Sequence, residues 1–135
     1  LNFRLARPAV VVDINRMSGL GEIREEDRQI AVGALVRQRR LEVWAQQGFP
    51  LLADALRYVG HHAIRTRGTI AGSLAHADPA AELPALLVCL EGSVVARSPA
   101  GHREVRAREL FVSHLTTSLR PDELITEVRL PRLQT

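Results

Sequence analysis

Residues 60–84 read GHHAIRTRGTIAGSLAHADPAAELP, and this stretch decides how the rest of the chain is interpreted. Small residues gather in its centre, where we expect Gly68, Ala71, Gly72 and Ser73 to leave backbone N–H groups accessible. Thr69 and Ser73 add hydroxyl donors, and consecutive N–H groups in such a turn can bind an anion such as phosphate. On spacing alone the motif is weak, because a plain turn explains the same residues at least as often.

The end of the same stretch predicts the start of a helix over roughly residues 80–90. Asp78 is a good N-cap, and Pro79 suits the first helical position. Glu82 comes one position too late for a capping box with Asp78. It is either free to accept a hydrogen bond from a ribose hydroxyl, or a solvated first-turn acid stabilised by the helix dipole.

Strand and helix signals alternate along the rest of the chain. The β-branched run at 8–14 predicts a buried strand, and residues 16–26 predict a loop. Further predictions are a strand at 30–36, helices at 41–48 and 50–60, a hairpin at 93–107 and a strand at 123–130. The predicted fold class is therefore α+β, a mixed sheet with flanking helices.

The composition is that of one ordinary globular domain, with 135 residues, 46% of them hydrophobic and 24% charged. No apolar run approaches the roughly 18 residues that a membrane span needs. All 18 basic residues are arginine, but the net charge is only +3 and five aromatic residues offer few stacking platforms, so a nucleic-acid partner is not expected. The acidic pairs at 25–26 and 122–123 are predicted to be solvated loop residues.

The residues that commonly carry chemistry are sparse. The single cysteine, Cys89, excludes an internal disulfide, which fits a cytoplasmic location, and its apolar neighbours predict that it is buried. His61, His62 and His76 do not have a recurrent zinc spacing, so no metal site is expected. Arg65 and Arg67 are candidate phosphate contacts, although arginines beside a turn more often pair with surface acids.

The 60–84 stretch resembles the second flavin-binding segment of the molybdopterin-dehydrogenase flavoproteins. These are the FAD subunits or domains of carbon monoxide dehydrogenase, xanthine dehydrogenase and related molybdenum hydroxylases. The resemblance rests on a shared pattern of one arginine, several small residues and an acid, here Ile64, Arg65, Gly68, Thr69, Ile70, Gly72, Ser73, Ala77, Asp78, Pro79 and Glu82. It continues at 33–35 and 119–124, and so spans nearly all of the chain.

The resemblance implies a fold, a cofactor and a set of contacts. The fold would be the larger lobe of a PCMH-type FAD-binding domain. The cofactor would be FAD, and no side chain would act as a catalytic acid or base. The residues expected to contact FAD are Thr69, Ile70, Ala71, Gly72 and Ser73 around the pyrophosphate, Glu82 at a ribose hydroxyl, and Gly60 and His61 from the preceding loop.

The function that the resemblance implies is electron transfer. FAD would receive electrons from the iron–sulfur clusters of a molybdenum hydroxylase and pass them to an external acceptor. The expected partners are a molybdopterin-binding large subunit and a [2Fe-2S] small subunit. A hypothesis from another class is a non-catalytic assembly module that has lost flavin binding.

Two departures from the family pattern bear on that choice. Ala71 replaces the first glycine of the usual pair, which is harmless if its φ is negative but causes a clash if φ is positive. The family's first, Ala-Gly-Gly-rich flavin loop would lie before Leu1, and its small C-terminal domain would follow Thr135. Residues 1–135 are therefore expected to be a partial FAD-binding domain.

Overall fold

Strands that contain valine and isoleucine build the central sheet of the structure, a computed structural model that describes residues 8–132. The sheet has five strands, and all of its pairings are antiparallel. Their spatial order is β1 (Ile23–Glu25), β2 (Gln29–Gly33), β7 (Leu124–Pro131), β3 (Ser93–Ser98) and β4 (Gly101–Arg106). A separate two-stranded ribbon consists of β5 (Phe111–Ser113) and β6 (Thr116–Thr117).

One row of side chains shows how the register forms the core. Val32 of β2 lies opposite Val128 of β7, which lies opposite Val94 of β3, which in turn lies opposite Val105 of β4. All four side chains are buried in the main hydrophobic cluster. Because side chains alternate between the faces of a sheet, this row places the apolar face of four strands toward the helices.

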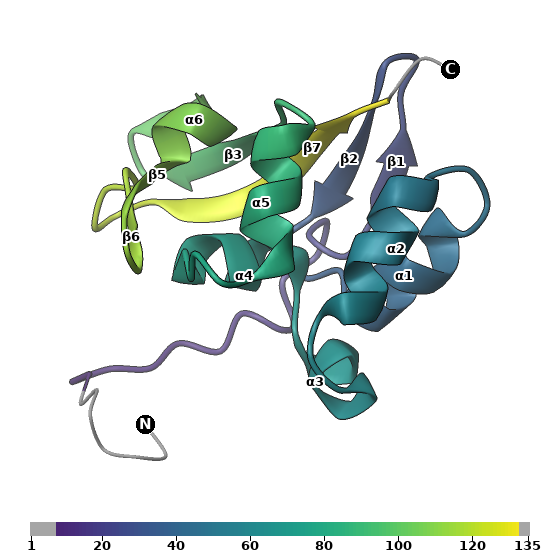
Figure 1. Cartoon of the computed structure of the whole chain (residues 1–135). Helices are drawn as coiled ribbons and strands as arrows, with labels where there is room; N and C mark the ends of the chain where they lie inside the picture. Colours follow the sequence, from purple (N-terminus) through teal and green to yellow (C-terminus); the bar gives the residue numbers. More distant parts are fainter. Residues whose placement is uncertain (1–7, 133–135) are drawn as a thin grey trace.

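Helices cover that apolar face of the sheet (Figure 1). They are α1 (Gln38–Ala45), α2 (Pro50–Tyr58), α3 (His62–Arg67), α4 (Ile70–His76), α5 (Glu82–Cys89) and the short α6 (Ala107–Leu110). Pro50 starts α2 at its first position, as the sequence predicts, and Leu52 and Leu56 place that helix in the core. No helix within residues 8–132 is long and apolar enough to cross a membrane.

Most of the elements predicted from local patterns are confirmed. These are α1, α2, α5, the β3–β4 hairpin around the turn at 98–101, and the strands β2 and β7. The predicted strand at 8–14 is wrong, because the valines at 10–12 are between 72% and 75% exposed and pair with no strand in the described chain. A β-branched run favours an extended backbone, but it becomes a strand only where a neighbour supplies hydrogen bonds.

Two predictions about acidic residues are also corrected. The predicted loop at 16–26 contains β1, which includes Glu25 and pairs with β2. Glu123 is not a solvated loop acid, because its side chain is only 4% exposed. Its carboxylate accepts hydrogen bonds from Arg103 Nε at 2.7 Å, Arg103 Nη2 at 2.9 Å and the Arg120 backbone N–H at 2.7 Å. Glu123 thus ties β4 to the loop before β7.

This arrangement predicts a pH-dependent stability. The hydrogen bonds from Arg103 and from the Arg120 backbone lower the pKa of Glu123 from 4.5 to about 2. A carboxyl group whose pKa falls on folding stabilises the protein fully above pH 4.5, and that stabilisation is lost as the pH falls from 4.5 toward 2. We expect Glu123→Gln to lower stability at pH 7 and to lose less further stability between pH 4.5 and 2 than the wild type does.

Urea unfolding at pH 7, 4 and 3 measures this difference. Glu91→Gln is the control, because Glu91 pairs with Arg108 at the surface and the two side chains are 72% and 75% exposed. Parallel stability curves for the wild type and Glu123→Gln over the acidic range would contradict the prediction.

Candidate functional site

The eight predicted contact residues all lie at or just before the beginnings of three consecutive helices. Gly60 and His61 precede α3, Thr69 is the N-cap of α4, residues 70–73 form its first turn, and Glu82 is the first residue of α5. Helix α4 packs against α5 (Figure 1). In the chain, α3 connects Gly60 and His61 to the residues at 69–73. The first turn of a helix carries N–H groups that have no acceptor within the helix.

The centre of the motif is a capped helix start rather than an irregular anion-binding loop. Thr69 Oγ1 accepts a hydrogen bond from the Gly72 N–H at 3.0 Å. Ile70 and Ala71 are buried, with 1% and 5% of their surfaces exposed, so their side chains anchor the first turn of α4 in the core. Because Ala71 lies within the helix and outside the group of positive-φ residues, its methyl group packs into the core without strain. The departure at Ala71 therefore leaves the motif intact.

The surface of this turn has little side-chain bulk. Gly72 is exposed, Ser73 is half-buried and carries a small hydroxyl, and the following Ala75 is exposed. The hydroxyl hydrogen of Thr69 remains available, because its oxygen only accepts in the cap. A pyrophosphate needs donors that it can approach closely, and these residues meet that need. The residues present therefore fit the phosphates of FAD.

The predicted cap at Asp78 is wrong. Helix α5 begins at Glu82 with Ala81 as its N-cap. Asp78 Oδ1 instead accepts from the Ala80 N–H at 2.9 Å, and the Asp78 carbonyl accepts from the Ala81 N–H at 3.0 Å. Asp78 thus forms a turn with residues 80 and 81 before the helix starts. An aspartate side chain can bond either within such a turn or to the first N–H groups of a helix, and here it bonds within the turn. Glu82 is half-buried and makes no side-chain hydrogen bond with residues 8–132.

Arg65 is not a free phosphate ligand. Its Nε donates to Glu42 Oε2 at 3.0 Å, and its Nη1 donates to the carbonyl oxygens of Val59 at 2.9 Å and Gly60 at 3.0 Å. Glu42 also pairs with Arg39 at 3.0 Å. Burial raises the pKa of Glu42, but the hydrogen bonds and charges of Arg39 and Arg65 outweigh it, so the pKa lies below its usual value. Arg65 is therefore a structural residue.

Sequence reasoning missed two polar residues beneath the motif, Gln38 and Glu42, each 4% exposed. Gln38 Nε2 donates to the Thr69 carbonyl at 3.3 Å, and a Cβ on Gly68 would lie 2.7 Å from Gln38 Oε1. The signal that could have found them is helical spacing, because Gln38 and Glu42 share the buried face of α1 with Leu41 and Ala45. Polar residues at apolar positions of a helix indicate specific buried partners.

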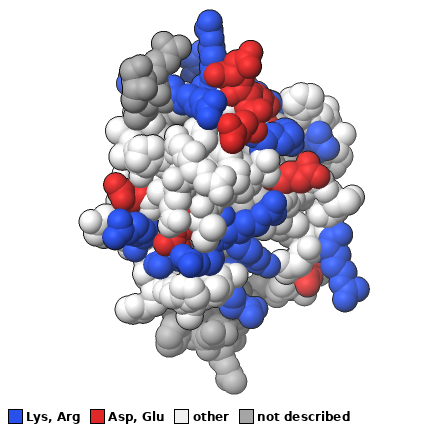
Figure 2. All heavy atoms as spheres, turned by 90° about the vertical axis from the view of Figure 1, so that its right-hand side faces the viewer, with Lys and Arg blue, Asp and Glu red and all other residues white. Residues whose placement is uncertain are grey.

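Arginines form a band across the face that includes α1 and α2, with acidic side chains beside it (Figure 2). Arg37, Arg39 and Arg40 line a shallow hollow there. Each also has a partner within the fold, because Arg37 donates to the Arg67 carbonyl, Arg40 to the Gly21 carbonyl, and Arg39 pairs with Glu42. Arg37 and Arg40 thus connect the start of α1 to neighbouring segments of the chain, whereas the Arg39–Glu42 pair lies within α1.

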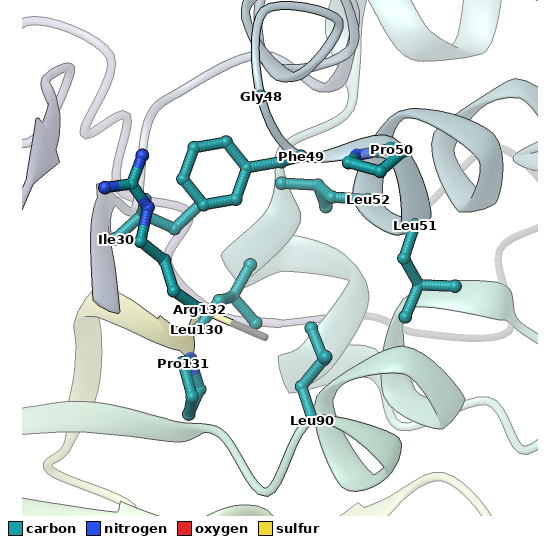
Figure 3. A pocket seen from close by; sticks show the side chains of 10 residues that line it. All are labelled: Ile30, Gly48, Phe49, Pro50, Leu51, Leu52, Leu90, Leu130, Pro131 and Arg132. Atoms are coloured by element: carbon teal, nitrogen blue, oxygen red, sulfur yellow. The ribbon is translucent and has the colours of Figure 1, made fainter. Parts of the chain in front are cut away.

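Other candidate features lie apart from the predicted contacts. The cavity in Figure 3, about 200 Å³ in volume, is bounded by apolar residues of α2, β2 and β7 and by Arg132, whose guanidinium lies 4.8 Å from the Phe49 ring centre. None of the eight predicted contacts lines it. Cys89 is exposed, which corrects the prediction that it is buried. Within residues 8–132, no three His, Cys, Asp or Glu side chains are placed to hold a metal ion.

Comparison with known proteins identifies relatives of the whole chain. The family described as FAD binding domain in molybdopterin dehydrogenase matches residues 1–133. The 6-hydroxypseudooxynicotine dehydrogenase complex subunit alpha of Paenarthrobacter nicotinovorans is 50% identical over 98% of this chain and 46% of its own length. Caffeine dehydrogenase subunit beta of Pseudomonas sp. (strain CBB1) is 41% identical over 97% of this chain and 45% of its own length.

A solved structure agrees with the fold. Carbon monoxide dehydrogenase from Hydrogenophaga pseudoflava, in a form that lacks the Mo-pyranopterin moiety, matches with a TM-score of 0.93 and 36% identity. The match covers 98% of this chain and 47% of that one, and this chain spans about half the length of the relatives that it matches. The predicted fold class is confirmed. The chain belongs to the family of FAD-binding domains in molybdopterin dehydrogenases, and FAD is its cofactor.

Proposed function

We propose that this chain is the flavin-binding part of an electron-transfer subunit in a molybdenum hydroxylase. The observation that supports this most is the first turn of α4, where Gly72 is exposed and Ser73 carries only a small hydroxyl, within a family match over residues 1–133. The relatives are named as subunits of dehydrogenases. The partners that we propose are a molybdopterin-binding large subunit and a [2Fe-2S] small subunit.

In this proposal, residues at the starts of α3, α4 and α5 contact different parts of FAD. Thr69 and Ser73 donate their hydroxyls to the pyrophosphate, while Ile70 and Ala71 offer first-turn backbone N–H groups and Gly72 leaves the approach open. Glu82 accepts from a ribose hydroxyl, and Gly60 and His61 contact the cofactor from the loop before α3. When bound, FAD supplies the redox chemistry, and the protein supplies binding and orientation.

Substrate choice is not assigned to this chain in the proposal. Relatives that are 50% and 41% identical to it are named for 6-hydroxypseudooxynicotine and for caffeine, which are different compounds. A similar domain therefore accompanies different substrates. We infer that the reaction with substrate takes place on the proposed molybdenum subunit, and that this chain carries the electrons onward.

Titration of the chain with FAD, followed by flavin fluorescence, tests the proposal. We expect saturable binding by the wild type and binding at least tenfold weaker by Gly72→Asp. An added carboxylate about 6 Å from a phosphate charge costs roughly 3 kcal/mol at an effective dielectric constant of 20. A tenfold loss corresponds to about 1.4 kcal/mol. An acid in the first turn of a helix favours folding, so Gly72→Asp is expected to stay folded, with a small shift of the Thr69 side chain because the added Cβ would lie 3.0 Å from Thr69 Oγ1.

Gly48→Asp is the matched control, because Gly48 is exposed, lies in the loop before α2, and has no atom within 4 Å of an added Cβ. It adds the same charge away from the proposed site and is expected to bind FAD like the wild type. A folded wild-type chain that binds no FAD would contradict the proposal and favour the assembly module instead. Equal FAD affinities of the wild type and Gly72→Asp would show that the phosphates of FAD do not lie beside the first turn of α4.

A further inference from the structure

Helix α3 lies between the two proposed groups of FAD contacts but has almost no apolar packing of its own. None of its six residues is buried, and Ile64, its largest apolar side chain, is 53% exposed. In Figure 1 it stands out from the body of the molecule below α1 and α2. Isolated helices this short are unstable in water. Something other than hydrophobic burial must therefore hold α3 in place.

At its beginning, α3 is held by the guanidinium of Arg65. This group contacts three acceptors at 2.9–3.0 Å, the Glu42 carboxylate of α1 and the carbonyl oxygens of Val59 and Gly60 at the end of α2. The Arg65 and Glu42 side chains are 12% and 6% exposed. Gly60 has a φ of +44°, a left-handed conformation that the two carbonyl contacts help to fix. We call this set of contacts the Arg65 brace.

At its end, α3 is tied to the first turn of α1. The Gln38 N–H donates to the Gly68 carbonyl at 2.9 Å, and Gln38 Nε2 donates to the Thr69 carbonyl at 3.3 Å. These bonds place Thr69 for its cap on α4, independently of Arg65. Only the Gly60–His61 loop and the body of α3 depend on the brace. The two ends of α3 can thus be perturbed separately.

We propose that Arg65, oriented by Glu42, is a positioning residue for FAD that acts through the Gly60–His61 loop. The inference rests on the proposed function, because it takes Gly60 and His61 as cofactor contacts. An arginine is suited to this task, since its planar fork reaches a carboxylate and two carbonyls at once, whereas a lysine ammonium keeps the charge but not that fixed geometry. The brace lets a loop without an apolar anchor present its residues in one arrangement.

Arg65→Lys and Glu42→Gln test the brace first in the protein without cofactor. Amide hydrogen exchange is the readout, because the N–H groups of Ile64 and Arg65 bond to the His61 carbonyl at the braced end of α3. We expect exchange at these two amides to be at least tenfold faster in both variants, while the sheet amides and the Gly68 amide at the other end of α3 are affected less. Unchanged exchange at the Ile64 and Arg65 amides would overturn the brace.

FAD titration of the same variants then tests the positioning role. We expect affinity at least fivefold weaker for Arg65→Lys and no change for Arg108→Lys, the matched control from an ion pair whose side chains are 75% and 72% exposed. If Arg65 acts through the loop, its effect shrinks in a His61→Ala background, because the contact that it positions is already gone. A uniform loss of protection over the whole chain would indicate general destabilisation and overturn the inference.

The outcomes separate this inference from the proposed function. Fast α3 exchange together with weaker, non-additive FAD binding supports the inference. Fast exchange with unchanged FAD affinity overturns the positioning role while leaving the proposed function standing. A folded wild type that binds no FAD overturns both, and the exchange data still show whether Arg65 holds the loop.

Discussion

Gly33→Ala is expected to destabilise the protein by about 3 kcal/mol, because a methyl group at this position meets backbone on a neighbouring segment. A Cβ on Gly33 would lie 2.4 Å from the Leu20 carbonyl oxygen and 3.2 Å from the Glu22 nitrogen. That segment cannot easily withdraw, since the Gly33 N–H donates to the Glu22 carbonyl and the Leu35 N–H donates to the Leu20 carbonyl, both at 2.8 Å. Moving it away would break both bonds at the edge of the core.

Thermal and urea unfolding measure this loss, which corresponds to a melting temperature lower by roughly 10 °C. Gly21→Ala is the matched control in the same region, because Gly21 has no positive φ and an added Cβ would have no atom within 4 Å. It is expected to change stability by less than about 0.5 kcal/mol. Equal melting temperatures for Gly33→Ala and the wild type would show that the 20–22 segment yields easily.

Leu74→Ala is the second substitution with a large expected effect, again about 3 kcal/mol of destabilisation. Leu74 is fully buried, and together with Ile70 and Ala71 it fixes α4 in the core cluster beneath the sheet. Truncation leaves a cavity that the surrounding strands cannot close. Because α4 carries the proposed pyrophosphate contacts, we also expect weaker FAD binding by Leu74→Ala under conditions where the protein remains folded.

The control for this substitution is Leu51→Ala, since Leu51 lies on α2 with 41% of its surface exposed. It removes the same atoms from a partly solvated position, so we expect a loss below about 1 kcal/mol. Urea unfolding of both variants compares the two costs. Similar losses for Leu74→Ala and Leu51→Ala would contradict the placement of α4 in the core.

Local sequence patterns were sufficient for several elements because the signals lie within a few residues of each other. Pro50 marks the first position of α2, and Ser98, Pro99 and Gly101 mark the turn of the β3–β4 hairpin. The 60–84 stretch was sufficient for the family, which the match over residues 1–133 bears out. The eight individual FAD contacts remain predictions, and all eight residues lie at or just before the starts of α3, α4 and α5.

Other features depended on residues far apart in the chain. Glu42 is separated from Arg65 by 23 positions, and Arg103 from Glu123 by 20, and no periodicity connects such residues. Whether the valines at 10–12 form a strand likewise depends on a neighbouring backbone, not on their own preference.

The sequence by itself therefore determined the fold class and the family, and it predicted the segment that contacts the flavin. Only the tertiary structure decided that the motif begins a capped helix, that Arg65 braces the loop before it, and that Glu42 and Glu123 are enclosed. The physical reason is that short-range preference places helices and turns, whereas the burial of charge and the pairing of strands are set by whichever distant residues the packed core brings into contact.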